Sequence, residues 1–136
     1  KVEGTLAELD YDKELKLWEL VIEANKKGFL NAAKDVNVGG IAIALAKMVA
    51  KSKKGVTCKV TCNDARDIFA ESFSRAIVEV SDEAGFEAMA KTIGLNVVKI
   101  GTVGGNMFTC NDVSKSVEAI CERYFGRFVE VVEQDI

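Results

Sequence analysis

The spacing of apolar residues along the chain predicts where its helices and strands lie. A first helix is predicted from a cap at Asp10 or Asp12 to about Lys27. Gly28 can end this helix, because glycine readily adopts the left-handed conformation that closes a helix. One face of the predicted helix is apolar, with charged residues elsewhere around it, and consists of Leu15, Trp18 and Ile22.

The remainder of the chain alternates between segments with strand spacing and segments with helix spacing. Residues 56–62 alternate apolar and polar side chains, which is the period of a strand. Gly104, Gly105 and Asn106 have the composition of a hairpin turn. The elements predicted after the first helix are a strand at 32–36, a buried helix that begins at the glycine pair 39–40 and runs to about 51, a strand at 56–62, a turn or short helix at 63–69, a strand at 75–80, a helix at 82–93 capped by Ser81, and strands at 97–103 and 107–110.

The last predicted helix has the clearest pattern in the chain. It follows a cap at Asn111 or Asp112 and carries one apolar stripe at intervals of three and four residues. The stripe consists of Val113, Val117, Ile120, Cys121, Tyr124, Phe128, Val131 and Val132. The helix at 82–93 has an inward face made of Phe86, Met89, Ala90 and Ile93. This order of elements predicts one α+β domain over 1–136, with helices layered on a mixed, mainly antiparallel sheet.

Composition and charge narrow the classes of function. The chain has 136 residues, of which 49% are hydrophobic and 29% charged, with a net charge of −3. These values exclude intrinsic disorder, and no uninterrupted apolar run reaches the ~18 residues that a membrane span needs. The small acidic surplus gives no indication of a nucleic acid partner. The chain contains no histidine, which removes the commonest acid–base residue and metal ligand.

The beginning of the chain and its cysteines indicate the cellular setting. The chain starts with Lys1 and has no charged-then-apolar leader segment, so we expect a fragment of a longer cytoplasmic protein. If 56–62 is a strand, Cys58 and Cys62 lie about four rises of ~3.3 Å apart, beyond the ~7 Å limit of a disulfide. We therefore expect all four cysteines to be reduced thiols, and no zinc site.

The turn between Asp35 and Gly40, with the sequence DVNVGG, is the first candidate functional segment. A strand end delivers Asp35, and two glycines, Gly39 and Gly40, lead into a helix whose free N–H groups could bind an anion. Glycine also lets a ligand or another backbone approach closely. The alternative interpretation is a tight strand-to-helix connection that needs glycine only for its backbone angles.

The second candidate is the segment of Glu71, Ser72 and Arg75, just before a strong strand. Glu71 and Arg75 could pair with each other, bind a ligand, or contact a neighbouring domain, and a structural ion pair is the default interpretation. Residues 101–105 resemble a phosphate loop only superficially, because GK[ST] is missing and a strand follows. A magnesium site built from Asp64, Asp67 and Glu71 is a weak hypothesis. No nucleophile–base pair is present, so no catalytic residue is assigned.

Three segments occur in a characteristic order and spacing: DVNVGGIAIALAKM at 35–48, IFAESFSRAIVEV at 68–80 and VVKIGTVGGNMF at 97–108. Together they resemble the C-terminal domain of the aminoimidazole ribonucleotide synthetase superfamily, over roughly residues 10–133. The resemblance implies an α+β module packed beside a partner domain that carries an ATP site. Within the superfamily, the resemblance is strongest to the glutamine-dependent amidoligases of purine biosynthesis, which contain the two-domain unit twice. The segments resemble the last domain of those enzymes.

For the whole enzyme, the resemblance implies ATP-driven replacement of the carbonyl oxygen of formylglycinamide ribonucleotide by ammonia. It also implies Mg²⁺ with the ATP, a glutaminase subunit that supplies ammonia, and preceding domains of the same chain as partners. Two alternatives stay open. One is a hydrogenase-maturation or selenophosphate enzyme of the same superfamily, and the other is a non-enzymatic α+β interaction module.

The match to the superfamily is incomplete at both candidate segments. The residues that match are Asp35, Gly39, Gly40, Glu71 and Ser72. The residues that depart from the pattern are Lys34 in place of His, Asn37 in place of Ser, Val38 in place of Asp and Phe73 in place of Gln. The resemblance therefore implies a mainly structural domain that is inactive alone and binds no cofactor or metal by itself. The candidate substrate or anion contacts are Asp35, Gly39, Gly40, Glu71, Ser72 and Arg75.

Overall fold

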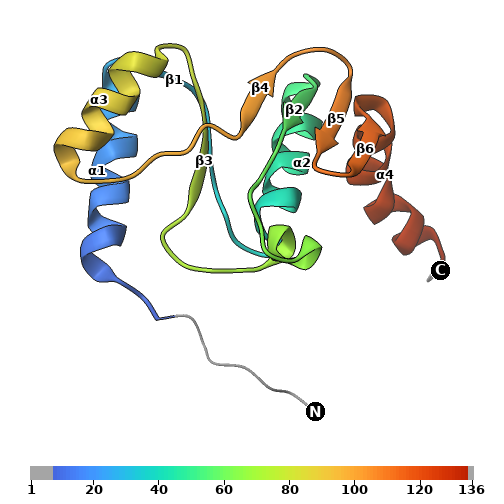
Figure 1. The fold of residues 1–136 in the computed structure, drawn as a ribbon. Coiled ribbons are helices and arrows are strands. Elements are labelled where there is room, and N and C mark those ends of the chain that lie inside the picture. Colours follow the sequence, from blue (N-terminus) through green and yellow to red (C-terminus); the bar gives the residue numbers. More distant parts are fainter. Residues whose placement is uncertain (1–7, 135–136) are drawn as a thin grey trace.

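The computed structural model describes residues 8–134, in which helices and strands alternate (Figure 1). Asp10 caps the first helix by accepting a hydrogen bond from the Lys13 N–H, and Gly28 follows its end with φ 74°, both as predicted. The elements in order are α1 Tyr11–Lys26, β1 Leu30–Asp35, α2 Gly40–Ser52, β2 Val56–Cys58, the 3₁₀ helix η1 Ala65–Phe69, β3 Ala76–Val80, α3 Glu83–Ile93, β4 Gly101–Val103, β5 Met107–Cys110, β6 Val113–Ser116 and α4 Val117–Gln134.

The described strands form two sheets. Strands β1 and β3 pair antiparallel, and the second sheet has the order β4-β2-β5-β6, in which only β2 and β5 run parallel. Helices α1 and α3 lie together beside the first sheet, whereas α2 and α4 lie with the second (Figure 1). The α+β class with a mixed, mainly antiparallel sheet is thus confirmed, although the strands divide into two sheets.

Each sheet has its own apolar core. In the first core, Leu20 and Ala24 of α1 pack against Phe86 and Ala90 of α3. Met89 and Ile93 are partly buried against the same cluster, so the predicted inward face of α3 is confirmed. The second core joins α2, β2, β5 and the start of α4, and consists of Leu45, Val49, Val56, Cys58, Phe108, Cys110 and Val117.

The apolar face predicted for α1 lies outside both cores. Leu15, Trp18 and Ile22 are exposed, whereas Leu20, on another side of the helix, retains 2% of its accessible surface. An amphipathic pattern predicts the opposite arrangement. The helix is anchored through Leu20 and Ala24, and its broader apolar face points to solvent.

The predicted strands of the second sheet are longer than the observed ones, and the predicted hairpin is absent. Strand β2 ends at Cys58, because the Val60 N–H donates to the Asn111 side chain instead of to a neighbouring strand. Similarly, β4 begins only at Gly101 instead of at residue 97. Strand β2 lies between β4 and β5, so residues 104–106 cross over its start instead of joining paired neighbours. Gly55 fixes this crossing by donating to the Gly105 carbonyl and accepting from the Gly104 N–H.

The predicted start of the last helix is also wrong. Residues 113–116 form strand β6, which pairs with β5 after a tight turn in which Asn111 adopts φ 52°. Helix α4 begins at Val117, and the Ser116 hydroxyl accepts a hydrogen bond from the Ala119 N–H in place of the predicted caps. Likewise Asp82, and not Ser81, caps α3 by accepting from the Gly85 N–H.

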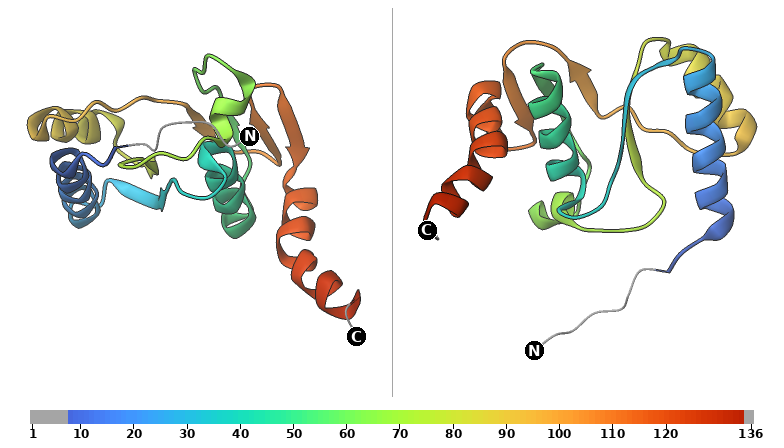
Figure 2. Two further views of the ribbon diagram at one scale, coloured as in Figure 1. Left: turned by 90° about the horizontal axis from the view of Figure 1, so that it is seen from below. Right: turned by 180° about the vertical axis from the view of Figure 1, so that it is seen from behind.

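Only the first turns of α4 bury the predicted stripe. Val117 is in the core and Ile120 and Cys121 pack against it, whereas Tyr124, Val131 and Val132 are exposed. Val113 is exposed on β6, and the Phe128 side chain lies outside the described residues. The distal part of α4 projects away from the body of the molecule (Figure 2). None of the helices in the described range is long and apolar enough to cross a membrane.

Candidate functional site

The glycine turn and the segment after η1 meet at the start of α2. Gly39 and Gly40 have φ values of 84° and 64°, in the left-handed region that glycine adopts without steric cost. The Gly40 N–H donates to the Asn37 carbonyl at 2.8 Å, which closes the turn. Gly40 is buried against the backbone of η1, because a Cβ at this position would lie 2.6 Å from the Ile68 carbonyl oxygen. The glycine pair thus serves both for its backbone angles and for the close approach of another group. At Gly40 the approaching group is the protein's own backbone.

A carboxylate of the protein occupies the N-terminus of α2. The Gly39 N–H donates to Glu71 Oε1 at 3.1 Å, although 32 residues separate them in the sequence. Gly39 has no side chain to cap the helix, so Glu71 supplies the negative group that a helix N-terminus favours. The Gly39 N–H at this turn is therefore paired with a side chain from the second candidate segment, which connects the two segments.

Asp35 lies at the exposed side of the same turn. Lys34 Nζ donates to Asp35 Oδ1 at 2.7 Å, and Asn37 Nδ2 donates to Asp35 Oδ2 at 2.6 Å. The hydrogen bond from Lys34 and its positive charge lower the pKa of the Asp35 carboxyl below its usual value. Two of the four residues that depart from the superfamily pattern, Lys34 and Asn37, are thus the partners that hold Asp35.

Arg75 and Glu71 do not form the predicted structural ion pair. The Arg75 guanidinium donates to the Ala70 carbonyl at 2.6 Å, and the Arg75 carbonyl accepts from the Val36 N–H at 3.0 Å. Arg75 thereby holds the loop of residues 70–75 against the end of β1. Its Nε is buried without a hydrogen-bond partner. Ser72 and Phe73 lie exposed on the same loop.

The weaker candidate segments have structural roles. Residues 101–103 form β4, paired with β2, so the glycines at 104 and 105 serve the crossing and no phosphate loop forms there. Asp64 and Asp67 form a capping box around η1, and the Arg66 side chain lowers the pKa of Asp64 by hydrogen bonding. Within the described part of the chain, no group of three or more His, Cys, Asp or Glu is placed to hold a metal ion.

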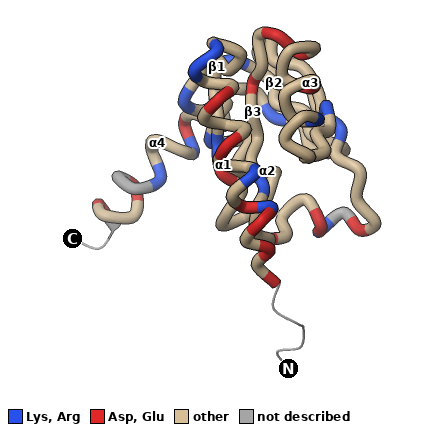
Figure 3. The backbone as a smooth tube through the Cα atoms, turned by 90° about the vertical axis from the view of Figure 1, so that its left-hand side faces the viewer, with Lys and Arg blue, Asp and Glu red and all other residues tan. Residues whose placement is uncertain are grey.

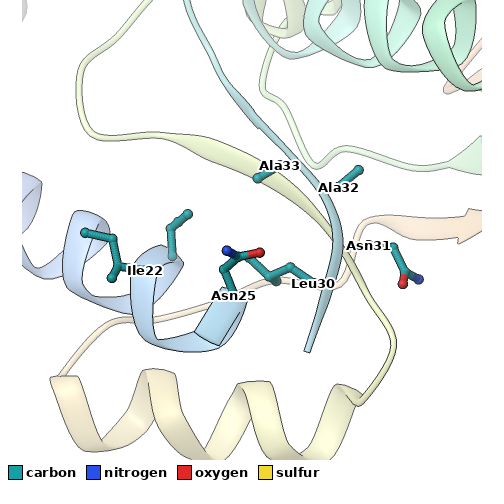
Figure 4. A pocket seen from close by; sticks show the side chains of 7 residues that line it. Ile22, Asn25, Leu30, Asn31, Ala32 and Ala33 are labelled. Carbon is teal, nitrogen blue, oxygen red and sulfur yellow. The ribbon is translucent and has the colours of Figure 1, made fainter. Parts of the chain in front are cut away.

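Two hollows lie among the described elements, and the sequence pattern predicted neither. The larger, about 640 Å³, lies between the two sheets beside α2. Apolar residues such as Leu45, Met48 and Ile77 line it together with the lysines Lys34, Lys47, Lys51 and Lys54. The smaller, about 330 Å³, lies between α1 and β1 (Figure 4). Pairing of strands that are distant in sequence creates the larger hollow, so local periodicity carried no signal for it.

The chain resembles known proteins in sequence and in fold. No protein-family model matches it. It is 55% identical over 137 residues to the phosphoribosylformylglycinamidine synthase subunit PurL of Sulfurimonas denitrificans, covering 99% of this chain and 18% of the relative. It is 53% identical over 135 residues to PurL of a Sulfurovum species, covering 98% of this chain and 18% of the relative. The chain therefore spans less than a fifth of the length of these relatives.

Solved structures share the fold. The PurLQS structure from Thermotoga maritima matches with a TM-score of 0.71 and 21% identity, over 86% of this chain and 23% of that one. T. maritima PurL in complex with ATP matches with a TM-score of 0.64 and 21% identity, over 78% of this chain and 21% of that one. Over its whole length, this chain is homologous to one segment of the synthase subunit PurL and has the fold of that segment.

Proposed function

We propose that the chain is one module, the last domain, of a longer cytoplasmic phosphoribosylformylglycinamidine synthase subunit. In this proposal the whole enzyme uses ATP and Mg²⁺ to replace the carbonyl oxygen of formylglycinamide ribonucleotide by ammonia in purine biosynthesis. The observation that carries the proposal is the 55% identity to PurL of S. denitrificans across 99% of this chain. The alignment extends over 99% of the module, so it covers both the core and the turn at the start of α2.

We infer that the module's part in this reaction is structural. Glu71 already accepts the Gly39 N–H at the start of α2, so a phosphate at this turn would have to displace a carboxylate of the protein. Phe73 presents an exposed apolar ring where the superfamily has a polar residue. ATP and Mg²⁺ would therefore bind elsewhere in the longer chain, and residues 1–136 alone would be inactive.

The proposed partners follow from the relatives. The T. maritima structure named PurLQS contains PurL with other components, which supports a glutaminase subunit as the source of ammonia. The domains that complete the longer chain are the second class of partner, because this chain covers 18% of PurL from S. denitrificans. No nucleic acid or membrane partner is proposed.

An amidation assay tests the proposal. The full-length subunit and the 136-residue chain are each supplied with formylglycinamide ribonucleotide, ATP, Mg²⁺ and ammonium, and the amidine product and ADP are quantified. We expect product from the full-length subunit and none from the 136-residue chain. A full-length subunit that fails to amidate this substrate under conditions where it is folded contradicts the proposed reaction. Turnover by the 136-residue chain contradicts the structural role.

A further inference from the structure

Helix α1 presents a row of large apolar side chains to solvent. The row, called the α1 stripe below, consists of Tyr11, Leu15, Trp18 and Ile22, whose exposed fractions are 73%, 68%, 60% and 47%. These residues share one face, because intervals of three and four residues match the 3.6-residue repeat of a helix. Contiguous apolar surface of this kind on a protein marks a site of contact with another surface.

The ring at the centre of the stripe is already fixed in orientation. Trp18 Nε1 donates to Glu14 Oε1 at 3.0 Å, and the Ser74 hydroxyl donates to the other carboxylate oxygen of Glu14 at 2.6 Å. Ser74 lies on the loop before β3, so this pair of hydrogen bonds ties the exposed ring to a second element of the fold. Fixing a side chain in advance removes part of the entropy cost of binding, and tryptophan is enriched among the residues that dominate interfaces.

A hollow next to the stripe provides a place for a partner's side chain. Ile22 belongs to both the stripe and the lining of the hollow of about 330 Å³, which Leu30 and Ala33 of β1 also line. Figure 4 shows Ile22 and Asn25 on the helix facing this space beside β1. The lining combines apolar side chains with the amide of Asn25, which suits an apolar anchor flanked by backbone polar groups.

We propose that the α1 stripe and the hollow beside it are covered by an apolar face of another domain of the same longer chain. The inference rests on the proposed function for the existence of that domain, since PurL of S. denitrificans is covered only to 18% by this chain. Charges of both signs are interspersed along α1, as Figure 3 shows, so the helix offers no one-sided field to steer a separate partner. A covalently linked domain needs no such steering, because its effective concentration is already high.

Hydroxyl-radical footprinting read by mass spectrometry tests this assignment without any mutation. The oxidation rate of Trp18 is measured in the 136-residue chain and in the full-length subunit, with a reporter peptide to equalise the radical dose. We expect the rate to fall at least about fivefold in the full-length subunit. Equal rates in the two chains overturn the proposal. Protection in the 136-residue chain that grows with its concentration also overturns it, because the occupant would then be a second copy.

A pair of variants separates docking from local folding. Trp18→Glu changes the net charge by −1 within the stripe, whereas Lys16→Glu changes it by −2 on the same helix outside the stripe, so the control carries the larger charge change. We expect Trp18→Glu to lower the melting temperature of the full-length subunit by several degrees more than Lys16→Glu, and the two to differ little in the 136-residue chain. Equal effects in the full-length subunit contradict the docking. A folded wild-type subunit in which Trp18 is protected from oxidation but which catalyses no amidation would instead contradict the proposed function alone.

Discussion

The close approach of α2 to η1 predicts a large difference between two glycine-to-alanine substitutions. A Cβ on Gly40 would lie 2.6 Å from the Ile68 carbonyl oxygen and 2.8 Å from the Ala70 carbonyl oxygen, and the residue has φ 64°. Gly28 has a similar φ of 74°, but a Cβ there meets nothing within 4 Å. Gly28→Ala is therefore a matched control that carries the backbone strain without the steric clash.

The magnitudes follow from these two terms. A left-handed conformation costs an alanine about 1–2 kcal/mol, which applies to both variants. Forcing an additional methyl into packed backbone costs about 1–3 kcal/mol more, which applies to Gly40→Ala alone. We therefore expect Gly40→Ala to lower the free energy of unfolding by about 2–5 kcal/mol and Gly28→Ala by about 1–2 kcal/mol.

Urea unfolding of the 136-residue chain, followed by circular dichroism, measures both values. Because η1 must move away to accept the methyl, Gly40→Ala should also release Glu71 from the Gly39 N–H, which amide exchange at Gly39 reports. If the two variants differ by less than about 0.5 kcal/mol, the backbone of η1 does not lie against Gly40 and the reasoning about this turn is wrong.

Three further predictions address the core, a buried thiol and the glycine turn. Leu20→Ala should cost about 2–5 kcal/mol and Leu15→Ala less than about 0.5 kcal/mol in urea unfolding, and equal costs would contradict the assigned faces of α1. Burial beside Cys110 raises the pKa of Cys58 from 9.0 to about 12, so the folded chain holds this proton while the unfolded chain loses it. The contribution of this protonated thiol to the free energy of unfolding should then be fully present below pH 9. Between pH 9 and 12 the free energy of unfolding should fall by up to about 1.4 kcal/mol per pH unit, and the fall should be shallower in Cys58→Ala. Equal slopes in urea unfolding would refute this. Calorimetric titration of ATP with Mg²⁺ into the 136-residue chain should give a Kd near or above about 1 mM, and micromolar binding that Gly39→Val abolishes would make the glycine turn a working site.

The sequence predicted elements whose signals are local and missed those that depend on distant partners. Helices α1, α2 and α3 have capping residues, glycine ends and apolar periods within themselves, and they were placed to within one or two residues. Strand β6 was assigned to the last helix because Val113 continues the helical stripe by chance. Its true pairing with β5 depends on the left-handed turn at Asn111.

The same distinction explains the candidate site. The two segments that meet at α2 were both identified from residue types and from the resemblance. Their contact, Glu71 to Gly39, spans 32 residues and left no local pattern. The prediction that the apolar face of α1 lies in the core was wrong for a related reason. An apolar period indicates that a face is buried, but it does not indicate which surface covers that face.

The position of β2 has a consequence for synthesis of the protein. This strand of three residues hydrogen-bonds on both sides to segments made much later, β4 at Gly101–Val103 and β5 at Met107–Cys110. While the chain emerges from the ribosome, α1, β1, β3 and α3 can assemble once Ile93 is exposed, but one edge of β2 stays open until β4 follows and the other until β5 follows. Open strand edges are templates for aggregation, and domains fold as their sequence emerges. A chain released before residue 110 should thus precipitate through β2, so the vulnerable interval of biosynthesis is set by the central strand and not by the helices.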